Sequence, residues 1–277
     1  MAAGHAEDGA VARIADSLAD AGTAIAFTGA GVSTASGVPS FRGENGVWND
    51  AFDPADFRIE RFERDPAGFW ADRIDLHERM YGTAGPSDGR NDGEPSASKR
   101  GERDASTVAP NAAHDALAEL EAAGVFEAVV TQNVDGLHAA AGTESLLEIH
   151  GNARRSVCVD CGGTTPTEDV RERVRNGETP PRCDCGGLLK PDVVLFGERL
   201  PPVFREARRL AREADACLVA GSSLTVEPAA SLPERVARGG ELHVVNFDAT
   251  PLDDVATTVC RADVTAVLPA LADRLVG

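Results

Sequence analysis

The chain has 277 residues, which is enough for one large domain or two smaller ones whose core needs no disulfide bonds. Its 27 basic and 45 acidic residues give a net charge of −18, which disfavours nucleic acids and anionic membrane surfaces as direct partners. Only two of the basic residues, Lys99 and Lys190, are lysines, and this composition indicates a solubility adaptation of the kind that high salt favours. No apolar run approaches a membrane span and we identify no secretory signal, so we expect a cytoplasmic protein.

Apolar residues recur at helical spacing over 11–21, and a short apolar strand is predicted at 24–28, directly before a glycine-rich turn. Further strands are predicted at 126–133, 215–223 and 241–248, and helices at 111–124, 203–214 and 229–239. Short apolar strands separated by helices are typical of a parallel sheet covered on both faces. We therefore predict an α/β fold with a Rossmann-like parallel sheet.

Two stretches interrupt this pattern. Residues 83–108 are rich in glycine, serine, proline and charge, so we predict a disordered polar loop that buries too little apolar area to fold. Residues 154–189 hold four clustered cysteines and several glycines, which predicts a small module stabilised by a metal.

The first motif, GAGVSTASGVPSFRG, occupies residues 29–43. Gly29 and Gly31 allow a tight turn close to a ligand, and the amides at the start of an expected helix suit a pyrophosphate. For GAG alone, a plain strand-to-helix turn is an equally good interpretation. Phe41 and Arg42 favour a binding loop, because they add an aromatic face and a guanidinium that a structural turn does not need.

The second motif, TQNVDGLH, spans residues 131–138 at the carboxyl end of a predicted strand. Gln132, Asn133 and Asp135 could hold an amide or a ribose hydroxyl there, although an Asn/Asp turn explains any one of them. His150, in LLEIHGN, is a candidate general base. Considered alone, it is more often a core histidine.

The four clustered cysteines form two pairs, Cys158-x2-Cys161 and Cys183-x-Cys185, each followed by two glycines. This spacing suits a tetrahedral zinc ion, and four thiolates leave no open position, so we predict one structural zinc. The second pair is one residue shorter than usual, and two reduced pairs without metal are the alternative.

Three further segments are ordinary loops when considered alone. Residues 190–198 form a strand-like run that could pair with an extended peptide. The small residues at 221–228 could hold a phosphate or ribose, and Asn246 follows a strand where an adenosine-ribose contact is expected.

These motifs, in this order, resemble the sirtuin family of NAD-dependent protein-lysine deacylases from about residue 11 to residue 276. The resemblance implies a large Rossmann-like domain and a smaller domain that combines a zinc module with a helical insertion. The expected division is 1–45, 109–152 and 190–277 for the large domain, 46–82 for the helical part, 83–108 for the polar loop and 153–189 for the zinc module.

The resemblance also assigns roles to individual residues. His150, as the general base, and Asn133 are the expected catalytic residues. NAD is expected to contact Gly29, Ala30, Gly31, Ser33, Phe41, Arg42, Gln132, Asn133, Val134, Asp135, Gly221, Ser222, Ser223, Asn246 and Ala262. An acylated-lysine protein, bound as an extended peptide, is expected to contact Val194, Phe196 and Gly197.

The implied reaction consumes NAD. The acyl oxygen attacks the nicotinamide ribose carbon, nicotinamide leaves, and His150 takes a proton from a ribose hydroxyl that attacks the acyl carbon. The products are free lysine, nicotinamide and O-acyl-ADP-ribose, and acetyl is the acyl group that we expect. Three rivals are ADP-ribosyl transfer to a protein, a non-enzymatic NAD-binding or zinc-stabilised adaptor, and an NAD-dependent oxidoreductase.

Specificity for acidic acyl groups is a further alternative. Family members that remove succinyl or malonyl groups carry a Tyr-x-x-Arg pair, and here Trp70 and Arg73 occupy the matching positions. Arg73 could bind a carboxylate. The interpretation that we favour for it is a surface residue paired with Asp72 or Asp75.

Overall fold

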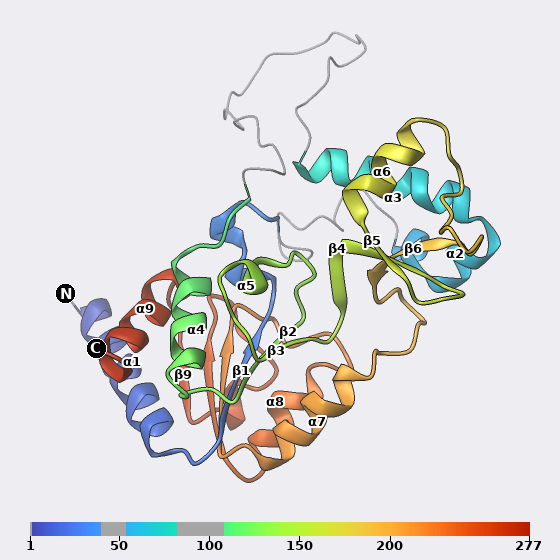
Figure 1. Cartoon of the computed structure of the whole chain (residues 1–277). Coiled ribbons are helices and arrows are strands. Elements are labelled where there is room, and N and C mark those ends of the chain that lie inside the picture. Colours follow the sequence, from blue (N-terminus) through green and yellow to red (C-terminus); the bar gives the residue numbers. More distant parts are fainter. Residues whose placement is uncertain (1, 40–53, 82–107) are drawn as a thin grey trace, which may run out of the picture.

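A parallel sheet of six strands forms the centre of the large domain in the computed structural model, which describes residues 2–39, 54–81 and 108–277 (Figure 1). The strands lie in the order β3 (Leu146–Glu148), β2 (Ala128–Thr131), β1 (Ala24–Thr28), β7 (Ala216–Ala220), β8 (Glu241–Val245) and β9 (Thr258–Cys260). All five neighbouring pairs are parallel, as predicted. The central strands β1 and β7 are buried along their whole length, which explains their unbroken apolar sequences.

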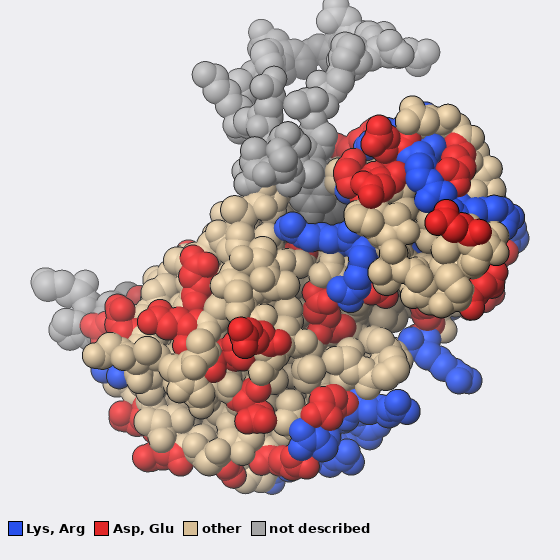
Figure 2. Space-filling view, viewed as in Figure 1, with Lys and Arg blue, Asp and Glu red and all other residues tan. Residues whose placement is uncertain are grey.

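Helices cover both faces of this sheet. One face packs against α1 (Ala2–Asp20), α4 (Ala112–Ala122) and α9 (Val264–Leu275), and the other against α7 (Val203–Glu213) and α8 (Ser231–Val236). Acidic side chains are spread over the visible surface, whereas basic side chains gather in a few places, among them α7 and the small domain (Figure 2). No helix in the described ranges is long and apolar enough to cross a membrane.

The smaller domain contains a three-stranded antiparallel sheet. Its members are β4 (Gly151–Cys158), β5 (Thr164–Pro166) and β6 (Leu189–Val193), with α6 (Thr167–Arg175), η3 (Pro54–Phe57), α2 (Ile59–Arg64) and α3 (Pro66–Tyr81) beside them. Since β6 pairs with β4, residues 190–193 lie in this small sheet, whereas the sequence analysis placed them in the large domain. Two apolar clusters join α2 and α3 to β6 and to the cysteine-bearing turns.

The glycine motif after β1 does not begin an α-helix, contrary to the sequence prediction. It forms two short 3-10 turns, Ala30–Val32 and Thr34–Ser36. In an α-helix the carbonyl of Val32 would accept the amide of Ser36, but here it accepts the side-chain amide of Asn111 at 2.9 Å. Phe41, Arg42 and nearly all of the predicted polar loop at 83–108 lie outside the described residues.

Candidate active site

Two glycine turns interlock at the carboxyl ends of β1 and β7. The amide of Gly31 donates to the carbonyl of Gly221 at 2.8 Å. A Cβ on Gly31 would lie 2.7 Å from the Cα of Gly221, and a Cβ on Gly221 would lie 2.4 Å from the amide nitrogen of Val32. Gly221 also has a φ of +59°. Only glycine therefore fits at these two positions, and the backbone is left bare where a ligand of an open α/β sheet binds.

A buried polar cluster links this turn to the end of β2. The side-chain amide of Asn133 donates to the carbonyl of Gly29 and to Oγ of Ser33, both at 3.1 Å. The hydroxyl of Ser33 in turn donates to Asp135 at 2.7 Å, and the other oxygen of Asp135 accepts the amide of Leu137 at 2.8 Å. The structure thus brings together three predicted site residues from two separate motifs, and each is held by more than one hydrogen bond.

His150 follows β3 and is oriented by the loop after β2. Its Nδ1 lies 3.2 Å from the carbonyl of Gln132, which can only accept, so Nδ1 carries the proton and Nε2 is left as an acceptor. Burial lowers the pKa of His150 below its ordinary value, and the hydrogen bond to Gln132 opposes this in part. Nε2 has no hydrogen-bond partner among the described residues, and a neutral imidazole whose Nε2 can accept a proton is the form that a general base requires.

The remaining predicted nucleotide contacts that the structure describes also lie at the carboxyl edge of the sheet. The side chain of Gln132 donates to the buried hydroxyl of Ser222 at 2.8 Å, which joins the β2 and β7 ends. Ser223 is exposed, and Asn246 after β8 donates to the carbonyl of Asp248 at 2.9 Å. The other predicted members, Ala30 and Val134, are partly buried in the β1 and β2 loops, and Ala262 is buried after β9.

The predicted peptide-binding segment runs between the two domains. The amide of Val194 donates to the carbonyl of His150 at 2.9 Å, which ties this segment to the candidate base. The backbone of Phe196 bonds to Phe57 and Ile59 of the small domain at 3.0 Å each, and its ring is 40% exposed. Gly197 then turns the chain with a φ of +85°.

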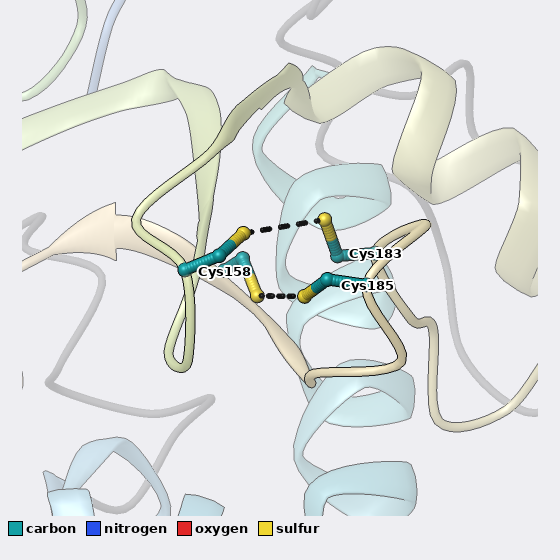
Figure 3. A group of neighbouring side chains, drawn as sticks. Cys158, Cys183 and Cys185 are labelled. Atoms are coloured by element: carbon teal, nitrogen blue, oxygen red, sulfur yellow. Dashed lines mark hydrogen bonds between the residues drawn. The ribbon is translucent and has the colours of Figure 1, made fainter.

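The four cysteines of the small domain converge on one point. Their sulfur atoms all lie within 4.8 Å of one another, and the closest pairs join opposite turns, at 3.5 Å for Cys158 and Cys185 and 3.7 Å for Cys161 and Cys183 (Figure 3). Four sulfurs around zinc at about 2.3 Å would be about 3.8 Å apart, so the cluster fits tetrahedral zinc.

The glycines that follow the cysteine pairs explain why the shorter pair still fits. Gly162 and Gly186 have φ values of +71° and +91°, so each turn reverses sharply. A Cβ on Gly187 would lie 2.6 Å from the sulfur of Cys158. The turn with one residue fewer between its cysteines therefore presents both thiolates to the same point as the longer turn.

Trp70 lies in the core of the small domain, which disagrees with its predicted place in an acyl pocket. Its side chain is 1% exposed, packs against Cys158, Val170 and Leu189, and donates to the carbonyl of Leu189 at 2.8 Å. The indole N–H is thus already used. The position joins α3 to the metal-binding turns.

Arg73 is not the surface ion-pair partner that we favoured. Asp72 pairs with Arg61 at 3.0 Å, and in the ranges that the structure describes no carboxylate lies within ion-pair distance of Arg73. The guanidinium instead lies 5.4 Å from the centre of the Phe57 ring. Burial, with Arg171 nearby, lowers the pKa of Arg73 to about 10.

Two buried histidines behind the site were not singled out from the sequence. Nε2 of His114 lies 3.3 Å from Oγ of Ser33, and Nε2 of His138 lies 2.9 Å from Oγ1 of Thr28. Their rings are 4.9 Å apart, and burial lowers the pKa of both, that of His138 to about 3. One signal was available, since Asn111 and His114 have the spacing of a capping box.

The comparison with known proteins agrees with this site. A model of the Sir2 family matches residues 59–228. The chain belongs to the Sir2 family. This confirms the sirtuin resemblance predicted from the motifs.

Sir2 relatives match nearly the whole chain. An NAD-dependent protein deacetylase of Haloarcula marismortui is 52% identical over 265 residues, which cover 95% of this chain and 93% of that protein. NAD-dependent protein deacylase 2 of Archaeoglobus fulgidus is 35% identical over 269 residues, 96% of each chain.

Solved Sir2 structures share the fold. A complex with a deacetylated p53 peptide and 3′-O-acetyl-ADP-ribose has a TM-score of 0.79 at 34% identity, covering 95% of this chain and 97% of that chain. A complex with a p53 peptide and NAD+ has a TM-score of 0.75 at 35% identity, covering 94% of this chain and 96% of that chain. The predicted fold class is thereby confirmed.

Proposed function

We propose that the protein removes acyl groups, above all acetyl, from protein lysines in an NAD-dependent reaction. The observation that carries the proposal is the meeting of the bare glycine turns, the cluster of Asn133, Ser33 and Asp135, and the free Nε2 of His150 at one edge of the sheet. The Sir2 relatives are named deacetylases and deacylases, in agreement with this arrangement.

NAD would supply the ADP-ribosyl group that accepts the acyl group, and one water molecule would be consumed as nicotinamide and free lysine are released. The residues of this chain bind NAD and orient it. The turn at Gly29 and Gly31 lets the phosphates approach the backbone, and Ser222, Ser223 and Asn246 face the adenosine half. Asn133 and Asp135 hold the nicotinamide ribose. Their hydrogen bonds to Ser33 and Leu137 fix the two side chains before NAD binds, so little freedom is lost on binding.

His150 is the general base. The carbonyl of Gln132 holds the proton on Nδ1, so Nε2 takes the proton from the ribose hydroxyl that attacks the acyl carbon. The acylated lysine enters as an extended peptide along 194–197, and the backbone bond between Val194 and His150 sets this segment beside the base. Four thiolates would hold zinc without an open position, so the metal stabilises the small domain and takes no part in catalysis.

The test is a mass-spectrometric assay of one lysine peptide in acetyl and succinyl forms, with and without NAD. We expect NAD-dependent loss of the acetyl group with equimolar release of nicotinamide, and no loss with His150→Ala, although this variant still binds NAD. Nicotinamide release with intact acetyl-lysine and an ADP-ribosylated protein would instead support a transferase. NADH formation would support an oxidoreductase, and NAD binding without turnover an adaptor.

A further inference from the structure

Lys190 is a buried lysine that the reaction described above does not use. Its side chain is 8% exposed. The ammonium donates to the carbonyls of Pro191 and Val193 at 3.1 and 2.8 Å and to Oε2 of Glu198 at 3.1 Å. An ammonium has three N–H groups, so every donor has a partner. A buried charge of this kind is costly unless it is paired, and here the pairing is complete.

Glu198 connects this charge to the turn at 195–198. The same Oε2 that receives the ammonium also accepts the amide of Leu195 at 2.9 Å. The amide of Glu198 donates back to the carbonyl of Leu195, also at 2.9 Å. The carboxylate therefore closes the turn that contains Phe196 and Gly197, and Lys190 joins the closed turn to β6.

Within the segment 194–197, backbone hydrogen bonds to other described residues form at Val194 and Phe196 but not at Gly197. Val194 bonds to His150, and Phe196 bonds to Phe57 and Ile59. The amide and carbonyl of Gly197, by contrast, form no backbone hydrogen bond to another described residue. Those groups are available to an added peptide strand.

We infer that the Lys190–Glu198 pair is a positioning device that fixes the segment 194–197 for the acylated peptide before it binds. This inference rests on the proposed function and deepens it. Because the Lys190 side chain is only 8% exposed, the pair would act through the segment and not by contact with the peptide. The two residues order the segment before the peptide arrives, so binding does not include the entropy cost of ordering it. The pair therefore increases the affinity for the peptide. NAD binds at the glycine turns and at the β2 end, which neither residue contacts.

The test measures steady-state kinetics with an acetylated peptide for Lys190→Met, Glu198→Gln and the double variant. We expect the KM for the peptide to rise about tenfold in Lys190→Met, which is about 1.4 kcal/mol, with kcat and the KM for NAD within about twofold of wild type. Since the pair acts as a unit, the double variant should raise the KM for the peptide no further than the larger single effect. Arg209→Met is the matched control, because it removes an exposed ion pair with Glu206 on α7.

A folded Lys190→Met enzyme with an unchanged KM for the peptide would overturn the inference. So would equal rises in both KM values, because these would indicate general loosening. If Lys190→Met does not fold, Glu198→Gln decides, since it keeps the shape of the side chain and removes its charge. An unaltered KM for the peptide in that variant would refute the pair's role. Failure of the proposed function is distinct, since the wild type itself would then show no NAD-dependent deacylation.

Discussion

Replacing Trp70 distinguishes a core residue from a substrate contact. Trp70→Phe keeps an aromatic ring but removes the N–H that donates to the carbonyl of Leu189 at 2.8 Å. A buried carbonyl that loses its donor costs about 1–3 kcal/mol, and the void left by the smaller ring adds in the same direction. At roughly 2–4 °C for each kcal/mol, we expect the melting temperature to fall by about 2–12 °C.

The assay is thermal unfolding followed by circular dichroism, with peptide kinetics measured below the transition. Because Trp70 packs on Cys158, we also expect zinc to be lost at a lower temperature than in the wild type. Phe247→Ala is the control, since that ring is 66% exposed and its loss should leave the melting temperature unchanged. An unchanged melting temperature for Trp70→Phe, combined with an altered preference between acetyl and succinyl peptides, would refute the core assignment.

Three other changes test the site. His150 acts as a base in its neutral form, and burial lowers its pKa, so kcat/KM should stay constant as the pH falls through 6.5 and decrease only at lower pH. A pH–rate profile in which kcat/KM already falls above pH 6.5 would contradict this. Cys183→Ser should reduce bound zinc from one equivalent toward none and lower the melting temperature, measured by metal analysis and calorimetry; full zinc retention would argue against ligation. Gly221→Ala should raise the KM for NAD at least tenfold, because a Cβ there meets the amide of Val32; wild-type NAD kinetics would show that the turns can separate.

The sheet was largely predictable from the sequence because its central strands are unbroken apolar runs. The strand at 24–28 has the predicted bounds, and the one at 215–223 is shorter by one residue at its start and three at its end. The strands β3 and β9 have only three residues each, too few to show a period. The helix α9 was not predicted, because Pro269 lies in its interior and proline normally interrupts a helix.

The grouping of the candidate site residues in space was predictable where one motif contains several polar residues, and not where a residue stands alone in the sequence. Asn133 and Asp135 lie in the same short loop after β2, so predicting the end of that strand was enough to place the two side chains together. His114 and Trp70 depend instead on partners 81 and 119 residues away, Ser33 and Leu189. The capping-box spacing of Asn111 and His114 marks the helix start, but periodicity and spacing carry no information about contacts with residues so distant in the sequence.

The bond between Val194 and His150 brings together the two points where the chain leaves the large sheet and returns to it. The intervening stretch, with its cysteines and small sheet, is therefore an insertion whose two ends touch. Insertions of this kind can be exchanged or rebuilt without altering the topology of the host, as in domain grafting. The surface of this stretch could thus change while the strands of the large sheet stay the same, as long as its apolar contacts with α2 and α3 are kept.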